Sequence, residues 1–147
     1  MKMTINFEIL KGRDIKGAYI SIEPFFYEDW AAEHHSDSIY IHEDAFIVAG
    51  YIIGLFQSRY SPYEITYLGR NNGNKIADVF DEFGTQIQKR LDLQFLVKKY
   101  VYENADQNWL MNIISEQPEK NAHLLIQLSA YLKGFLKRSE VVSIVGV

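Results

Sequence analysis

The sequence contains no cysteine among its 147 residues. Disulfide bonds, thiolate metal sites and cysteine nucleophiles are therefore excluded, and a cytoplasmic location is expected. Long apolar runs are also missing, since the longest, from Ala45 to Phe56, is 12 residues, whereas a membrane-crossing helix needs roughly 20. The first ten residues alternate polar and apolar types and lack the continuous apolar region of a signal peptide. The sequence therefore predicts a chain without a membrane segment.

Sequence motifs of catalysis are missing too. Neither the serine motif G-x-S-x-G nor the phosphate-binding motifs G-x-G-x-x-G and G-x-x-x-x-G-K-[ST] occurs. Paired carboxylates are present at Glu28-Asp29 and Glu43-Asp44, but neighbouring side chains on one element point apart, which makes joint acid–base work difficult. We therefore expect no catalysis and no cofactor.

Basic residues are absent over one long stretch, from Gly17 to Ser58. The remaining chain holds all 15 Lys and Arg residues against 12 acids, so the negative charge is concentrated in this stretch. Nucleic acid is not an expected partner here, because phosphate binding requires Lys and Arg. A basic protein surface or a cation fits better. The seven acids of the stretch are Glu23, Glu28, Asp29, Glu33, Asp37, Glu43 and Asp44.

Aromatic residues interrupt these acids, and the combination is typical of a protein-docking surface. Aromatic side chains anchor an interface by losing contact with water, while charges steer the partner. In the competing interpretation, Phe25, Phe26 and Trp30 belong to the core and the acids form an ordinary solvated face. The predicted partner-binding residues are Tyr27, Glu28, Asp29, Trp30, Glu33, Asp37, Glu43 and Asp44.

A metal site is the third interpretation of the same stretch. Imidazole and carboxylate groups are suitable ligands for zinc and other transition metals. Adjacent histidines point in different directions, however, and the sequence HEDAF lacks the second histidine of an H-E-x-x-H helix. We therefore predict no metal, and a metal-dependent enzyme remains an alternative. The residues concerned are His34, His35 and His42, with Asp37, Glu43 and Asp44.

Alternating apolar residues predict the strands. Met3–Ile9 shows the period of two typical of a half-buried strand, and Ala18–Ile22 is placed to pair back on it as a hairpin. Ser38–His42 is expected to be extended, and Tyr63, Ile65 and Tyr67 form the apolar side of a further strand. The β-branched closing segment VVSIVGV must be covered, so we place it inside the sheet.

Spacings of three and four predict the helices. Asp44 is a candidate N-cap for an apolar helix to Phe56, which we expect to be covered on more than one side. Gly50 and Gly54 would let another backbone approach that helix. Asn71–Gly73 is expected to be a turn. Further helices are predicted over Ile76–Leu91, over Leu93–Tyr102 where a strand also fits, over Trp109–Ile114, and from Pro118 with Leu124, Leu125, Leu128, Leu132, Phe135 and Leu136 buried.

The predicted fold class is α+β. Residues 1–147 are expected to form a single domain, since no repeat or low-complexity linker divides them. The sheet should be small and mainly antiparallel and should include both terminal strands. The helices that pack against it are concentrated in the second half.

Four segments carry a resemblance to a known class of proteins: INFEI, ISIEPFFYEDW, DSIYIHEDAF and the closing VSIVGV. In layout the chain resembles the immunity proteins of bacterial polymorphic-toxin systems, although it lacks the tryptophan-containing pattern expected of their commonest superfamily. The resemblance implies that the protein binds one cognate toxin and blocks it without catalysis. Many such toxins are nucleases with basic clefts. A regulatory homo-oligomer, such as a homodimer in which exposed aromatics meet a second copy, is the remaining alternative.

Overall fold

The structure, a computed structural model, describes residues 4–11, 17–25, 37–89 and 93–146. Within these ranges the chain forms one five-stranded sheet in the order β1-β3-β2-β5-β4, and every neighbouring pair is antiparallel. The strands are β1 (Ile9–Lys11), β2 (Tyr19–Glu23), β3 (Ile39–His42), β4 (Ile65–Gly69) and β5 (Val141–Val145).

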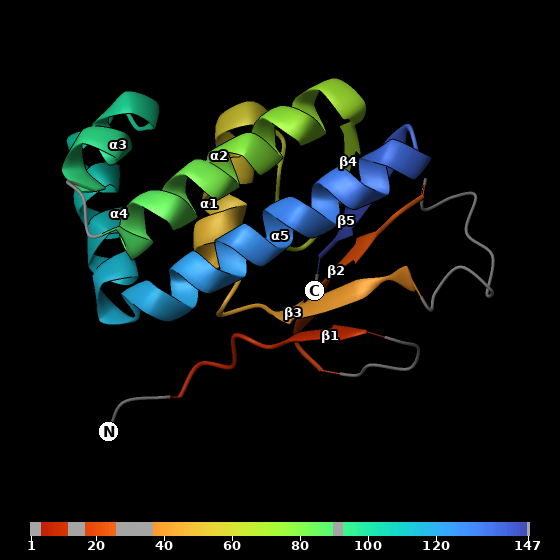
Figure 1. Ribbon diagram of the computed structural model, residues 1–147, viewed down its shortest axis with the longest axis horizontal. Coiled ribbons are helices and arrows are strands. Elements are labelled where there is room, and N and C mark those ends of the chain that lie inside the picture. Colours follow the sequence, from red (N-terminus) through yellow and green to blue (C-terminus); the bar gives the residue numbers. More distant parts are fainter. Residues whose placement is uncertain (1–3, 12–16, 26–36, 90–92, 147) are drawn as a thin grey trace.

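Helices fill most of the second half of the chain, as expected. Figure 1 shows α2 and α5 side by side along the molecule, with α3 and α4 together at one end. This arrangement of one antiparallel sheet and segregated helices confirms the α+β class. The helices are α1 (Ile47–Phe56), α2 (Arg70–Gln88), α3 (Leu93–Tyr100), α4 (Asn104–Glu116) and α5 (Pro118–Arg138).

The closing strand β5 lies inside the sheet, between β2 and β4. Ile144 pairs with Ile22 of β2, and Val142 pairs with Leu68 of β4. These four side chains are buried in the common core with the helices. The prediction that VVSIVGV is structural is therefore confirmed, and so is the prediction that strands from both ends of the sequence share the sheet.

The beginning of the chain differs from the prediction in two ways. Within the described residues the first strand starts at Ile9, although Ile5 and Phe7 are half-buried between exposed neighbours, as the alternation predicted, and Met3 lies outside the described residues. The predicted hairpin is wrong, because β1 and β2 both pair with β3, which lies between them. A period of two identifies a strand and its faces, but it carries no information about which strand lies beside it.

Strand β4 presents the opposite face to the one predicted. Thr66 and Leu68 are buried, whereas Tyr63 and Ile65 are 74% and 40% exposed. Alternation offers two faces, and Leu68 is the side chain that packs into the core with the helices. The predicted turn at Asn71–Gly73 is also wrong, because these residues form the first turns of α2.

Helices α2 and α5 pack closely along their length, and glycines of α2 make this possible. A β-carbon placed at Gly84 would lie 2.8 Å from the carbonyl oxygen of Ala122, and one at Gly73 would lie 2.5 Å from Leu136 Cδ1. Gly84 therefore has no room for a side chain, whereas a side chain at Gly73 would require Leu136 to move. Arg70 Nε also donates a hydrogen bond to the carbonyl oxygen of Leu136, at 2.7 Å, which satisfies one carbonyl of the last turn of α5.

The apolar positions predicted for these helices are largely confirmed. All six apolar residues named for α5 are buried, and so are Ile76, Val79, Phe80, Phe83 and Ile87 of α2. Leu91 lies outside the described residues. Leu93–Tyr100 is a helix, the favoured alternative, and Leu96 and Val97 are its buried side chains. Helix α4 is longer than predicted, since it starts at Asn104.

Candidate functional site

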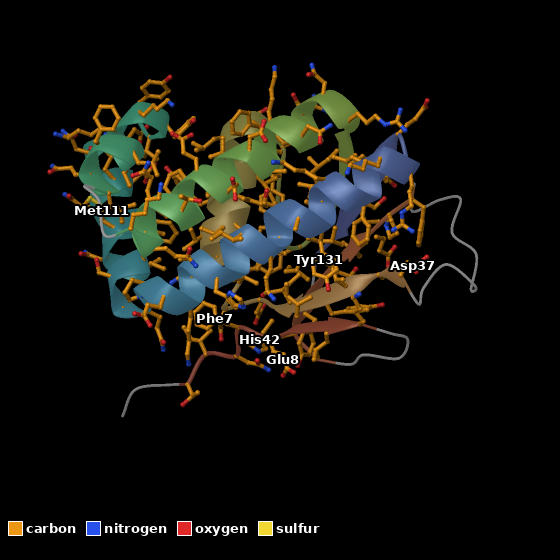
Figure 2. The ribbon with its side chains drawn as sticks, in the orientation of Figure 1. Phe7, Glu8, Asp37, His42, Met111 and Tyr131 are labelled. Atoms are coloured by element: carbon orange, nitrogen blue, oxygen red, sulfur yellow. The ribbon has the colours of Figure 1, made fainter. Side chains whose placement is uncertain are left out.

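The predicted docking residues are only partly described. Tyr27, Glu28, Asp29, Trp30 and Glu33 lie outside the described residues, as do Phe26, His34 and His35. Asp37 is exposed, and Glu43 and Asp44 are half-buried. Asp37 precedes β3 whereas Glu43 and Asp44 follow it, so they lie at opposite ends of that strand. Figure 2 shows this separation through Asp37 and His42.

His42 is held by its own turn. Its Nδ1 atom accepts a hydrogen bond from the backbone N–H of Asp44, at 3.2 Å. The Asp44 carboxylate lies 3.6 Å from the same atom. Among the described residues, no group of three or more His, Asp and Glu side chains could hold a metal ion.

The acids before α1 do not cap it. Helix α1 begins at Ile47, its N-cap is Phe46, and Phe46 makes no side-chain capping bond. The backbone N–H groups of Ala45 and Phe46 donate to the carbonyl oxygen of His42, at 3.0 and 3.1 Å, and form a turn between β3 and α1. The predicted cap at Asp44 is therefore wrong, because the chain makes this turn before it becomes helical.

Helix α1 was predicted to be covered on more than one side, and one of its faces is open. Ile47 and Leu55 are 39% and 37% exposed, although the helix as a whole is strongly apolar. Five residues at spacings of three and four form this face and line a groove of about 450 Å³. We call it the α1 groove, and these residues are Ile47, Gly50, Tyr51, Gly54 and Leu55.

Other segments complete the α1 groove. Trp109 of α4, 43% exposed, lines it, and its ring centroid lies 5.6 Å from that of Tyr51. Tyr60 and Pro62, in the link from α1 to β4, line it as well. Ile20 of β2 and Phe46 also belong to the lining, and because both are fully buried they form its floor.

The far end of α1 is fixed by Gln57. Its backbone N–H donates to the carbonyl oxygen of Ile53, at 2.8 Å. Its side-chain amide donates to the carbonyl oxygen of Tyr67, at 3.0 Å, and accepts a bond from Asn72 Nδ2, at 2.8 Å. These bonds join α1 to β4 and α2. The groove is therefore built on elements that the fold holds in place.

Two tyrosine hydroxyls belong to the lining of the α1 groove. The Tyr51 hydroxyl donates to Asp106 Oδ2, at 3.1 Å. Burial, this hydrogen bond and the negative charges of Asp106 and Glu103 raise the pKa of Tyr51 to about 12. Burial alone raises the pKa of Tyr60 to about 12. The Tyr60 hydroxyl has no hydrogen-bond partner among the described residues, so it can donate to a bound molecule.

Acidic groups surround the α1 groove. Glu43 lines it, and Asp106 and Glu103 act on Tyr51 inside it. Helices α1 and α4 contain no Lys or Arg, and Arg59 is the single base in the link between α1 and β4. The groove thus combines apolar walls with three nearby carboxylates against one arginine, an arrangement that suits an apolar group carried by a cationic partner.

The two glycines of α1 differ in their surroundings. A β-carbon at Gly50 would lie 3.0 Å from the Tyr60 hydroxyl, so a side chain of this chain already covers that position. A β-carbon at Gly54 would meet nothing within 4 Å. The sequence predicted that this glycine pair would let another backbone approach α1. In the described structure the space beside Gly54 is empty.

Sequence reasoning missed Tyr60 and Trp109 as site residues. Trp109 was predicted only as the start of a helical piece, and the apolar run of α1 indicated a helix covered on more than one side. The available signal was the stripe from Ile47 to Leu55 with two small residues in it. The sequence could not show that, among the described helices, none lies over Gly54 of this stripe.

One of the seven acids, Glu23, is not on the surface. It is 3% exposed in the middle of the sheet, opposite Ser143 of β5, and its Oε2 atom has no hydrogen-bond partner. Burial raises the pKa of Glu23 to about 6, against a smaller opposing effect of a hydrogen bond with Ser21. This acid cannot belong to a solvent-facing docking surface.

Comparison of the chain with models of protein families, with curated proteins and with solved structures gave no match. The groove must therefore be interpreted from its own geometry. In the part of the chain that the structure describes, no helix is both long enough and apolar enough to cross a membrane.

Proposed function

We propose that the chain is an immunity protein that binds a basic bacterial toxin and blocks it without catalysis of its own. The α1 groove carries this proposal. It is open and apolar, acids lie around it, and the two helices that line it contribute no base. An interface of this kind provides an anchor that loses contact with water and a field that attracts a cationic surface.

The base-free stretch of the sequence also supports a basic partner. The stretch from Gly17 to Ser58 lacks bases, and Asp37, Glu43 and Asp44 are its exposed or half-buried carboxylates among the described residues. A toxin with a basic cleft for a phosphate backbone would be attracted to such a surface. Occupying the cleft blocks the toxin, so the immunity protein needs no catalytic group.

Two competing functions have less support. A homodimer built on the α1 groove would bring Glu43, Glu103 and Asp106 of one copy near the same acids of the other, and like charges oppose this. A metal-dependent enzyme would need several ligands near His42, but the described residues contain no group of three or more His, Asp and Glu side chains that could hold a metal ion.

Purification from the native host at low salt, followed by an inhibition assay, tests the proposal. We expect a basic protein to co-purify, and we expect a stoichiometric amount of this chain to abolish that protein's toxicity. Raising the salt concentration should slow association, since steering between opposite charges is screened. A captured protein that is acidic, or whose activity this chain leaves unchanged, would contradict the proposal.

Charge reversal provides the matched control. Replacing Glu43 and Asp44 with Lys should slow association and reduce its salt dependence. Replacing Glu140 with Lys, at an exposed position between α5 and β5, should do neither. An equal effect of both changes would mean that net charge, and not this surface, controls binding.

A further inference from the structure

We infer that the α1 groove receives an amphipathic helix of the partner, with a bulky apolar side chain over Gly54 and Lys or Arg residues on its flanks. The inference rests on the proposed function, since it names the part of the protein partner that the chain would bind. It goes further by assigning the mode of recognition and the chemistry of the recognised segment.

The shape of the groove matches a helix-packing surface. Its five α1 residues are spaced as 47, 50, 51, 54 and 55, which is the face that one helix presents to another. The stripe lies along a helix of 10 residues, or about 15 Å. A partner helix can place two or three anchors on such a length, at intervals of three and four residues.

The same chain shows what a filled helix contact looks like. At Gly84 of α2, the carbonyl oxygen of Ala122 and the side chain of Ile126 of α5 occupy the space that a side chain would take. Gly54 has the same residue type on an apolar helix face, but nothing lies within 4 Å of its β-carbon position. Within residues 4–11, 17–25, 37–89 and 93–146, the α1 face therefore has the form of a helix contact without a second helix over Gly54.

Charge decides between the candidate occupants. Glu43 and Asp106 lie at the groove, Glu103 lies close enough to act on Tyr51, and α1 and α4 offer no base. A helix with Lys or Arg beside its apolar face meets complementary charge, whereas an acidic helix or a second copy of this chain meets repulsion. The Tyr60 hydroxyl adds a polar contact within the groove.

Gly54→Leu fills the open position without disturbing the core. Because nothing lies within 4 Å of the added β-carbon, the variant should fold, and it loses the low helix propensity of glycine. Gly134→Leu is the matched control. Gly134 is also inside a helix, α5, its β-carbon position is equally open, and it does not line the α1 groove.

A synthetic helix tests the inference directly. The probe is a roughly 18-residue peptide of Leu and Lys with all Leu residues on one helical face, and its counterpart carries Glu in place of Lys. Binding is followed by the fluorescence anisotropy of a dye attached to the peptide, so that no residue of the chain is changed for detection. We expect the Lys peptide to bind, Gly54→Leu to weaken it by about tenfold or more, and Gly134→Leu to leave its affinity unchanged. The Glu peptide should not bind.

Three outcomes would overturn the inference: no binding of the Lys peptide to the unsubstituted groove, equal affinity for Gly54→Leu, or preference for the Glu peptide. A concentration-dependent dimer that Gly54→Leu dissociates would also overturn it, because the occupant would then be a second copy. If Gly54→Leu still neutralises the co-purified toxin while the Glu43 and Asp44 reversals fail, the helix-in-groove inference is wrong and the proposed function stands. If no basic toxin is captured, the proposed function fails, and the peptide titrations still decide whether the groove binds a basic helix.

Discussion

Helices α5 and α1 are both rich in apolar residues, but only α5 has its apolar face fully covered. The six apolar side chains of α5 are buried against α2 and the sheet, and its bases point outward from the last turn. Helix α1 buries Val48, Ile52 and Ile53 but leaves Ile47 and Leu55 more than one-third exposed.

The difference indicates which apolar surface serves stability and which is available for binding. Exposed single apolar residues are normal on a protein surface. A contiguous stripe that lines a groove, with acids around it, marks an interaction site more often than chance exposure does. Substitutions on the covered face should therefore change unfolding, and substitutions on the α1 face should change binding.

The largest effect is expected from removing β5, the strand that follows the covered helix. Deleting Val141–Val147 takes buried Val142 and Ile144 out of the middle of the sheet and leaves β2 and β4 without their shared neighbour. Each buried side chain of this type contributes about 1.5–3 kcal/mol, against a total stability of about 5–15 kcal/mol. The truncated chain should show no cooperative thermal transition by circular dichroism. A transition like that of the full chain would show that the covered side does not depend on β5.

Two neighbouring residues of α4 separate the covered face from the open one. Leu110 is fully buried, and Leu110→Ala should lower the free energy of unfolding by about 2–5 kcal/mol. Trp109 lies at the groove, and Trp109→Ala should cost about 1 kcal/mol, mainly through its lost contact with Tyr51. Urea titrations measure both changes. For binding to the toxin we expect the opposite order: Trp109→Ala should speed dissociation of the complex more than Leu110→Ala does. Equal losses of stability would place Trp109 in the core.

Alanine at two glycines gives a smaller contrast with opposite signs. Gly84→Ala places a methyl group against the backbone of α5, so α2 and α5 must move apart, at a cost of about 1–3 kcal/mol. Gly54→Ala has open space around it and should stabilise the protein by up to about 1 kcal/mol, because alanine favours a helix more than glycine does. Thermal unfolding measures both changes in stability. If the two variants changed the stability in the same direction, the filled and the open helix face would not differ.

The sequence was sufficient for the covered parts because their patterns repeat. Spacings of three and four identified the buried faces of α2 and α5, and the run of β-branched residues at Val141–Val145 identified a core strand. The pairing of the strands was not predictable. Strand β3 lies between β1 and β2, and an alternating pattern does not show which strands are neighbours. Alternation also could not show which face of β4 is buried, because the face with Tyr63 and Ile65 is as apolar as the face with Leu68.

The candidate site was the harder part. The charge asymmetry was visible in the sequence, but a strongly apolar α1 indicated a covered helix, and only the tertiary structure shows that no described helix lies over Gly54. Trp109 and Tyr60 are more than 40 residues apart in the sequence. The fold brings both to α1, and no local pattern encodes that meeting.

Two carboxylates, Glu82 and Glu23, differ in their hydrogen bonding. Glu82 accepts hydrogen bonds from the Tyr100 hydroxyl, at 2.6 Å, and from Lys99 Nζ, at 3.3 Å, whereas buried Glu23 has an oxygen with no partner. Burial raises the pKa of Glu23 from 4.5 to about 6. The folded state therefore binds more protons than the unfolded state between these two values, and Glu23 destabilises the fold progressively as the pH rises through this window.

Glu23→Gln removes this charge and should raise the free energy of unfolding by about 1–2 kcal/mol at pH 8. At pH 4, where the native carboxyl is protonated and resembles the amide, the two proteins should be nearly equal in stability. Urea titrations at pH 4, 6 and 8 measure the difference, and Glu140→Gln, at an exposed carboxylate, is the control in which no pH-dependent gain is expected. The gain should appear between pH 4.5 and about 6 and then level off, because the extra protonation of the folded state is confined to that interval. A loss of stability at pH 8 would mean that the Glu23 carboxylate is compensated by a favourable interaction in the folded state and is not a group that the fold leaves incomplete.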